Sequence, residues 1–218
     1  MKKYIFFFIC MVTFLALPAK NNKNFVYLLD KFQPGTATLR TGVKSQGVFN
    51  YELISKKMHF LQNNDTLELL YPESIRDITI GDRVFEYVNG KEFYEKVKYD
   101  NINLYIRFHA SVLSKGKSAG YGSRSQTSAI DNVSIIPSGN TYIQLKDDEI
   151  FEVKRDYTFY IPVNGKLKRF TSLSSFSKIF KGYEEKIKNE LEGKNLNFDN
   201  PEDVKKAVEY CAQYILSK

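Results

Sequence analysis

Histidine is scarce in this 218-residue chain, which has only His59 and His109. A metal centre draws three or four closely spaced ligands from histidine, cysteine and carboxylate side chains, and neither histidine has a neighbour at ligand spacing. We therefore predict no metal, no cofactor, and both histidines on the polar surface of a strand. The alternative is a site assembled across strands from His109, Arg107 and Glu95.

Cysteine is equally rare, with Cys10 in an apolar N-terminal run and Cys211 in the apolar stripe of a C-terminal helix. No internal disulfide is expected, so a conventional hydrophobic core must stabilise the fold. We expect Cys211 to pack as a small hydrophobic side chain and not to act as a nucleophile.

Complete phosphate-binding loops are missing too. Gly116-Lys117-Ser118 looks like the end of a P-loop, but position 111 is serine where that loop needs glycine. Gly120 and Gly122 lack the third glycine of a dinucleotide-binding turn. With no catalytic constellation in view, we predict no catalytic residues and a protein that is not an enzyme.

No block of five or six like charges occurs, although the formal net charge is +7. The cations are spread in pairs such as Lys56-Lys57 and Lys205-Lys206. This pattern predicts a modest preference for anionic surfaces and no nucleic-acid partner.

The chain also lacks an apolar run long enough to span a bilayer as a helix, which takes about 20 residues. The longest run, 5–17, follows Lys2 and Lys3 and precedes Pro18-Ala19. This is the layout of a secretory signal peptide over residues 1–19, with an uncleaved anchor as the alternative. We predict export to the periplasm, the outer membrane or the extracellular space.

Residues 20–169 have the pattern of an antiparallel β domain. Three dipeptides that tolerate positive φ predict tight hairpin turns: Gly81-Asp82, Asn89-Gly90 and Asn164-Gly165. Polar and apolar residues alternate between the turns, with Leu104, Ile106 and Phe108 expected to face inward. We predict an α+β, mainly β fold: an antiparallel meander, as a curved sheet or half-barrel, with a C-terminal cap of two or three helices.

Residues 170–218 form the predicted helical segment, because the apolar period changes from two to near 3.6. Ser174 or Ser175 is expected to cap the first helix, and Gly182 to weaken or split it. Asn200-Pro201 predicts the start of the last helix.

A long Gly/Ser-rich loop is predicted over residues 114–139, where the strand rhythm stops. A loop of this length is either functional or disordered. If it is a docking surface, its candidate residues for an anionic glycan or lipid headgroup are Lys115, Lys117, Tyr121 and Arg124.

Four stretches resemble an uncharacterised family of exported, β-rich proteins of Bacteroidota-type bacteria. They are "GVFNYELISKKMHF" (47–60), "GDRVFEYVNGKEFYEKV" (81–97), "GYGSRSQTS" (120–128) and "FTSLSSFSKIFKGYEEKIKNELEGKNLNFDNPEDVKKAVEYC" (170–211). Tyr210-Cys211 stands where the family closes on an aromatic pair. The resemblance implies location and layout, but no activity and no site residues.

These observations favour an exported, envelope-associated, non-enzymatic binding or structural protein. Its partner would be an unknown envelope protein, glycan or lipid, which includes peripheral contact with a membrane. Seventeen Phe and fifteen Tyr favour, as an alternative, a carrier or sensor of a lipid or other apolar ligand in a curved sheet. A hydrolase with a site built across strands is the third hypothesis.

Overall fold

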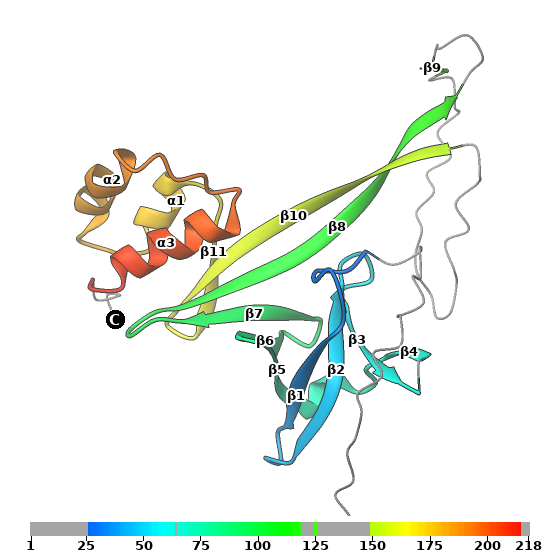
Figure 1. Cartoon of the computed structure of the whole chain (residues 1–218). Helices are drawn as coiled ribbons and strands as arrows, with labels where there is room; N and C mark the ends of the chain where they lie inside the picture. Colours follow the sequence, from blue (N-terminus) through cyan, green and yellow to red (C-terminus); the bar gives the residue numbers. More distant parts are fainter. Residues whose placement is uncertain (1–25, 64, 119–123, 126–148, 215–218) are drawn as a thin grey trace, which may run out of the picture.

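A computed structural model describes residues 26–214, except residues 64, 119–123 and 126–148. In this part of the chain an antiparallel sheet is followed by three short helices (Figure 1). The strands are β1 (Gln33–Leu39), β2 (Lys44–Glu52), β3 (Lys57–Gln62), β4 (Asp65–Glu68), β5 (Ile75–Ile80), β6 (Arg83–Val88), β7 (Glu92–Lys98), β8 (Asn103–Ser118), β9 (Arg124–Ser125), β10 (Glu149–Val163) and β11 (Lys166–Phe170). The helices are α1 (Leu173–Ser177), α2 (Glu184–Glu192) and α3 (Pro201–Cys211), and a 3₁₀ turn, Pro72–Ser74, precedes β5.

The sheet consists of two meanders joined edge to edge. Its strand order is β11-β10-β8-β7-β6-β5-β1-β2-β3-β4, with β9 paired to β8. The chain runs outward from β1 to β4, returns through the 3₁₀ turn, and places β5 beside β1. The predicted mainly β class, antiparallel meander and helical cap are confirmed, with this one return connection added.

The sheet curves back on itself at a contact that we call the seam. At the seam the Ala110 amide on β8 donates to the Leu53 carbonyl just after β2, at 3.0 Å. The Tyr51 ring of β2 stacks on Phe85 of β6, with centroids 6.3 Å apart. The concave face therefore encloses a core between strands that are distant in the sheet order.

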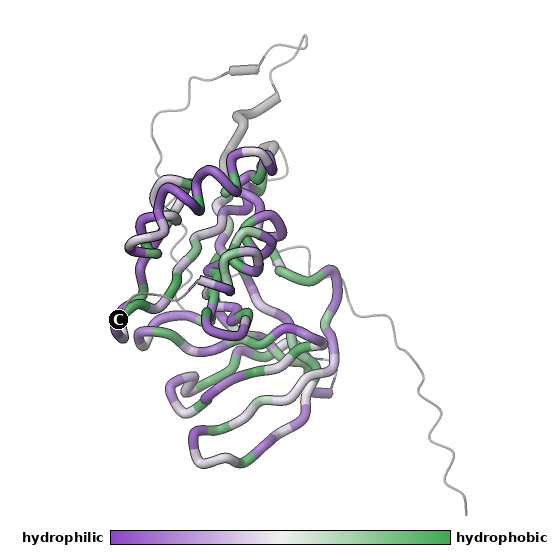
Figure 2. The backbone as a smooth tube through the Cα atoms, turned by 90° about the vertical axis from the view of Figure 1, so that its left-hand side faces the viewer, coloured by the Kyte–Doolittle hydropathy of each residue, from purple (hydrophilic) through white to green (hydrophobic). Residues whose placement is uncertain are grey.

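The predicted hairpin turns form where expected. Asn89 and Gly90 have φ of 54° and 65°, and Asn164 and Gly165 have 50° and 73°, the positive values that a type I′ turn requires at both central residues. Gly81 has a φ of 56° in the turn between β5 and β6. Hydrophobic and hydrophilic residues alternate along the strands between these turns (Figure 2).

One continuous hydrophobic core joins the sheet and the helices. Leu104, Ile106 and Phe108 are buried, as their alternation predicts. The ring of Phe170 on β11 contacts Phe176 of α1, with centroids 5.1 Å apart. Fully buried side chains of both parts belong to the same cluster: Tyr51, Ile78, Phe85, Phe159, Phe180, Leu191 and Val208. The helical segment therefore packs on the sheet and has no separate core.

The helix boundaries follow local capping chemistry. Ser172, and neither of the predicted serines, caps α1; Ser175 occupies the third helical position and completes a reciprocal capping box with it. Gly182, with a φ of 85°, separates α1 from α2, as predicted. Asn200 caps α3 by accepting from the Glu202 amide at 2.9 Å, with Pro201 at the first position.

The predicted loop over 114–139 is shorter at its start than expected. Residues 114–118 belong to β8, which pairs with β10 up to the Lys117–Glu149 position. Residues 124–125 form β9. The remaining positions, 119–123 and 126–139, lie outside the described residues. Across the described part of the chain, no helix is both long and apolar enough to cross a membrane.

Gly35 lies at a close approach between β1 and β5. A Cβ atom there would lie 2.4 Å from the Thr79 carbonyl oxygen and 3.0 Å from the Phe49 ring. We expect Gly35→Ala to lower the free energy of unfolding by about 2 kcal/mol, because the strands must separate to admit the methyl group. Urea denaturation measures this change. Gly193→Ala is the control, since nothing lies within 4 Å of its Cβ position, and an equal loss in both variants would contradict the prediction.

Candidate functional site

A two-stranded ribbon, which we call the arm, projects from the body of the fold. β7 pairs with β8 only over residues 103–106, whereas β10 continues beside β8 from Tyr105 to Lys117. Beyond the seam, β8 and β10 extend away from the other strands (Figure 1). A two-stranded ribbon is marginally stable by itself in water, so the arm depends on its anchorage in the body.

The candidate residues of the predicted loop belong to the arm or lie beyond its described part. Lys115 and Lys117 are in β8, Arg124 is in β9, and Tyr121 lies outside the described residues. β9 pairs with the end of β8, with Lys117 opposite Ser125 and Ser118 opposite Arg124. In this register, Lys117 and Arg124 occupy adjacent pairs of residues on the two strands.

Further cations lie where the arm leaves the body. The Lys154 side chain on β10 is 63% exposed, and its ammonium is 3.4 Å from the Asp156 carboxylate. Arg155 is exposed, and its guanidinium donates to the Tyr27 carbonyl at 3.0 Å. Val153 is 44% exposed beside them. The base of the arm therefore presents positive charge beside an uncovered apolar side chain.

A hydrolase motif in this region has the wrong structural context. Residues 116–120, Gly-Lys-Ser-Ala-Gly, fit the Gly-x-Ser-x-Gly pattern of a nucleophile elbow, which the sequence analysis missed. That motif needs a sharp turn from a strand into a helix. Here Ser118 ends β8 and pairs with Arg124 of β9, and no described helix follows before α1. The motif therefore gives no support to an enzyme.

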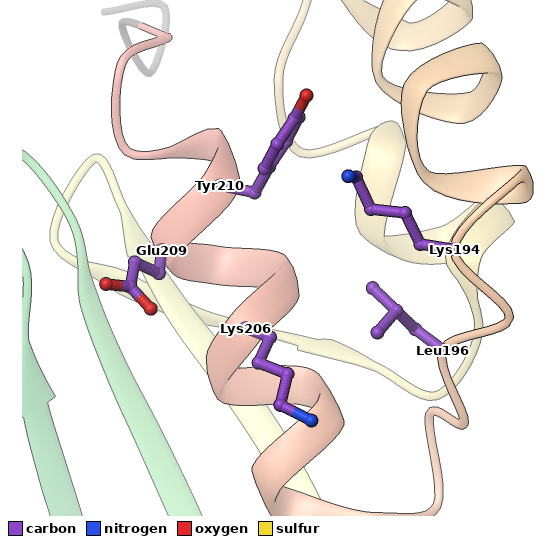
Figure 3. Close-up of a pocket in the computed structure, with 5 residues that line it drawn as sticks. All are labelled: Lys194, Leu196, Lys206, Glu209 and Tyr210. Carbon is purple, nitrogen blue, oxygen red and sulfur yellow. The ribbon is translucent and has the colours of Figure 1, made fainter.

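A second candidate site is a surface pocket of about 480 Å³ on the helical cap. It lies between α3 and the segment that follows α2 (Figure 3). The lining residues are Lys194, Leu196, Lys206, Glu209 and Tyr210. This pocket could not be predicted from the sequence, because its two walls come from segments that are positioned by buried residues on their other sides.

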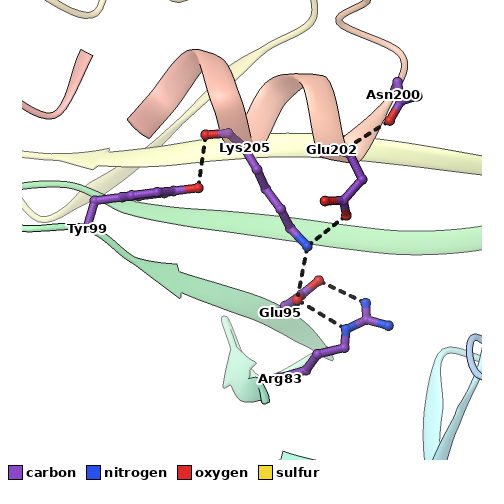
Figure 4. A network of polar contacts seen from close by, with 6 residues as sticks. All are labelled: Arg83, Glu95, Tyr99, Asn200, Glu202 and Lys205. Atoms are coloured by element: carbon purple, nitrogen blue, oxygen red, sulfur yellow. Dashed lines mark hydrogen bonds and ion pairs between the residues drawn. The ribbon is translucent and has the colours of Figure 1, made fainter. Parts of the chain in front are cut away.

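A buried carboxylate links α3 to the sheet. Glu95 on β7 is 3% exposed and accepts two hydrogen bonds from Arg83, at 3.1 and 2.8 Å. The ammonium of Lys205 reaches from α3 to within 3.6 Å of Glu95 and 3.1 Å of Glu202 (Figure 4). The Tyr99 hydroxyl donates to the Lys205 carbonyl at 2.9 Å. The network is structural, because its charges satisfy one another.

The predicted constellation of His109, Arg107 and Glu95 does not form. Glu95 pairs with Ile106 in the register of β7 and β8, so it lies on the opposite face of the sheet from Arg107. Instead, Glu92 accepts from Arg107 at 2.7 and 2.8 Å, and the ammonium of Lys56 lies 3.9 Å away. Alternation along β7 would have identified Glu95 as an inward residue between Phe93 and Val97.

Two buried polar atoms near the seam have no hydrogen-bond partner among the described residues, the Tyr51 hydroxyl and Nδ1 of His109. Burial lowers the pKa of His109, and the positive charge of Arg107 lowers it further. His109 stands opposite Asp156 in the register of β8 and β10. Arg107 and His109 alternate with the inward Phe108 and so lie on the outer face of the sheet, whereas Tyr51 lies in the core; these groups do not form a nucleophile with its base.

His59 is buried, with 6% exposure, so the prediction of a surface position is wrong. Its Nδ1 lies 3.1 Å from the Tyr27 hydroxyl. The segment from Val26 covers this side of β2, where Asn50 exchanges hydrogen bonds with the Leu29 backbone at 3.1 and 2.8 Å. Burial lowers the pKa of His59. The N-terminal covering segment explains why a polar face of β2 and β3 is buried.

Cys211 packs in the core as predicted. It is free and fully buried, and burial raises the pKa of its thiol to about 12, which removes the thiolate needed for reactivity. Among the described residues, no group of three or more histidine, cysteine or carboxylate side chains could hold a metal ion.

Comparison with known proteins finds no relative: no family model, no curated protein and no solved structure matches the chain. The resemblance to exported Bacteroidota-type proteins therefore stays a prediction. Function has to be argued from the arm, the pocket and the charge clusters.

Replacing Glu95 tests the buried network. We expect Glu95→Gln to lower the free energy of unfolding by about 3 kcal/mol, because Arg83 and Lys205 would keep their charges without a buried counter-charge. Denaturant titration measures the loss. Glu202→Gln is the matched control, since the Glu202 side chain is 71% exposed and exposed pairs contribute about 1 kcal/mol or less. Equal effects of the two substitutions would show that the network is not buried.

The histidines predict that acid weakens the fold. Both have pKa values below their ordinary value of about 6.5, so near pH 6 the unfolded chain binds more protons than the folded chain. The contribution of the two histidines to the free energy of unfolding is therefore fully present above their ordinary pKa. It is lost as the pH falls below that value. The charged groups around His109 are Arg107, Asp156, Lys56 and Glu92.

We expect His109→Gln to reduce the slope of unfolding free energy against pH between about pH 5 and 7. Urea titrations at several pH values measure this slope. His59 is unchanged in the variant, so the part of the slope that His59 causes should remain. An unchanged slope in the variant would contradict the assignment.

Proposed function

We propose that this protein is an exported, envelope-associated, non-enzymatic binding or structural protein whose arm contacts an anionic partner. The observation that carries the proposal is the extension of β8 and β10 beyond the rest of the sheet. An anchored ribbon with three cations in its strands, Lys115, Lys117 and Arg124, suits contact with an anionic glycan or lipid headgroup.

Charge supports the arm as the contact element. Lys154 and Arg155 continue the cationic character of the arm at its base, and both are exposed. The acidic residues Glu149 and Glu152 of β10 lie in the same ribbon, so attraction depends on the local arrangement of charge and is sensitive to salt. This is the behaviour of a peripheral, reversible contact.

An apolar carrier is a weaker proposal because the concave face is filled. Tyr51, Ile78 and Phe85 occupy it and are fully buried, and α1 and α3 cover the part formed by β8, β10 and β11. A lipid chain would have to displace these side chains. The aromatic content that motivated the carrier is used in ring contacts of the core, such as Phe159 with Phe170 at 5.8 Å.

The same packing weakens the hydrolase hypothesis. Arg107, Glu92 and His109 provide a base and charged groups. The hydroxyl considered as their nucleophile is that of Tyr51, which is fully buried. Burial raises the pKa of that hydroxyl. A buried phenol that resists ionisation is a poor nucleophile.

The arm predicts charge-dependent binding. We expect Lys115→Gln/Lys117→Gln/Arg124→Gln to weaken sedimentation with phosphatidylglycerol vesicles by roughly 100-fold, since each cation near an anionic membrane contributes about 1 kcal/mol. Alginate in place of vesicles tests an anionic glycan. Binding to one probe and not the other identifies the class of partner.

A charge-matched control lies on the edge strand β11, where Lys166, Lys168 and Arg169 are exposed. Their replacement by glutamine should leave binding within a factor of three of wild type. Equal losses in both triple variants would reduce the effect to net charge and overturn the role of the arm.

Protein recovered from cells with Met1 still at its N terminus would contradict cleavage of the predicted signal peptide.

A further inference from the structure

The three most exposed large apolar side chains of the described residues lie in two turns, which we call together the tip. Tyr71 is 71% exposed, Leu70 is 70% exposed and Val43 is 59% exposed, whereas the next, Val153, is 44% exposed. Leu70 and Tyr71 belong to the connection from β4 to β5, and Val43 ends the turn between β1 and β2. A single exposed apolar side chain is ordinary, but a group of them marks a contact surface.

Arg40 joins the two turns of the tip. Its amide donates to the Ser74 carbonyl at 2.9 Å, and its guanidinium Nε donates to the Glu73 carbonyl at 2.8 Å. Within the first turn, the Leu39 amide donates to the Val43 carbonyl at 2.8 Å. The two turns are therefore fixed beside each other before any partner binds, which reduces the entropy lost on binding.

Tyr71 has a backbone conformation that tyrosine disfavours. Its φ of 54° and ψ of 52° lie in the left-handed region, where a bulky side chain is an outlier. Of the six described residues other than glycine with positive φ, four are asparagine, and Tyr71 is the one with an aromatic ring. Its ring does not belong to the hydrophobic core, so no burial offsets the strain. Strain of this kind is concentrated at functional positions.

The charges beside the tip favour an anionic partner. Arg40 and Lys44 are exposed, and neither forms an ion pair with a carboxylate in the described part of the chain. Glu73 is the exposed acidic residue of the second turn. The exposed cations of β3 and β5, Lys57 and Arg76, are already paired with carboxylates. Two unpaired cations against one carboxylate leave a positive balance.

A lipid surface suits this combination of groups. Aliphatic side chains can enter the acyl boundary, a tyrosine ring lies at the level of the headgroups, and cations contact anionic headgroups. A turn that enters this region needs hydrogen-bond partners for its backbone, because hydrocarbon offers none. The tip meets this condition: the Ser74 amide and hydroxyl both donate to the Tyr71 carbonyl, at 3.0 and 2.7 Å, and Arg40 satisfies the next two carbonyls that face it.

We propose that the tip anchors the protein to an anionic lipid surface, with its three apolar side chains in the interface and with Arg40 and Lys44 at the headgroups. This proposal rests on the envelope association proposed above and names a membrane contact for it. The turn between β1 and β2 lies at the opposite end of the molecule from the arm (Figure 1). The tip and the arm can therefore hold different partners at the same time.

A single fluorophore tests insertion of the tip. The chain has no tryptophan, so Tyr71→Trp introduces one in the full protein. With vesicles of phosphatidylcholine mixed with phosphatidylglycerol, we expect its emission to shift to shorter wavelength and to be quenched by lipids brominated on the acyl chain, because the ring leaves water. Tyr210→Trp on α3 is the control, since Tyr210 is 42% exposed, and its emission should not change. No shift for Tyr71→Trp, or equal shifts for both variants, would overturn the proposal.

Removing the apolar side chains tests their contribution to binding. Leu70→Ser/Tyr71→Ser should weaken sedimentation with the same vesicles by roughly tenfold, because two apolar side chains lose their burial in the interface. Tyr210→Ser, which removes an exposed ring from the helical cap, should leave sedimentation unchanged. Unchanged sedimentation of the tip variant would contradict the proposal.

Tyr71→Gly separates binding from folding. Glycine adopts positive φ without a clash of its own, so this substitution should raise the urea midpoint of unfolding while it weakens vesicle binding. A lower midpoint would show that the ring supports the fold and would overturn its assignment to binding.

The arm variant Lys115→Gln/Lys117→Gln/Arg124→Gln distinguishes this proposal from the one for the arm. At saturating lipid, Tyr71→Trp should shift its emission in the arm variant as it does in the wild-type background. Loss of the shift would show that the tip does not bind lipid by itself and would overturn its role as an anchor. If only the tip variants lose vesicle binding and the arm variant binds vesicles and alginate like wild type, the proposal for the arm fails and the tip remains the membrane contact.

Discussion

The antiparallel pairing of β8 with β10 is the interaction on which the rest of the structure depends. Between Tyr105 and Phe108 the paired strands belong to the body, and toward Lys117 the same pairing forms the arm. β7 and the curved sheet attach to one side of this pair, while β11 and the helices attach to the other. A slip of β10 by one residue would turn its side chains to the opposite face of the sheet and expose Phe159, which lies opposite Ile106 in the shared core.

Buried polar groups fix the position of α3 on the sheet. Glu95 lies among hydrophobic side chains, where an unpaired carboxylate would lose several kcal/mol of hydration. Its partners come from β6 and from α3, which are distant in sequence, and the Arg83 guanidinium also lies over the rings of Phe85 and Phe108 at 5.3 and 5.0 Å. Hydrophobic contacts alone would let α3 slide along the sheet, whereas the charge network with Lys205 is satisfied in one position only.

Local chemistry explains which features could be predicted from the sequence. The turns at Asn89-Gly90 and Asn164-Gly165 and the cap at Asn200 depend on neighbouring residues alone, so their patterns were sufficient. The return from β4 to β5, the seam at Leu53 and the burial of His59 depend on segments far apart in the chain. The pocket could not be predicted for the same reason: Lys194 and Tyr210 meet only because Val208 is buried in the core and Phe198 packs against it.

The proposed sites lie where the core ends. Along β8 the inward positions are filled as far as Ala110, and beyond it Val153 is 44% exposed, so the arm extends past the apolar surface that the body can cover. In the connection from β4 to β5 the chain leaves the sheet, and Leu70 and Tyr71 are 70% and 71% exposed. Neither surface is needed to cover the core, and both combine cations with an uncovered apolar group. Residues on such surfaces can serve binding without a cost to the core. We therefore place function there and not among the buried charges of the sheet.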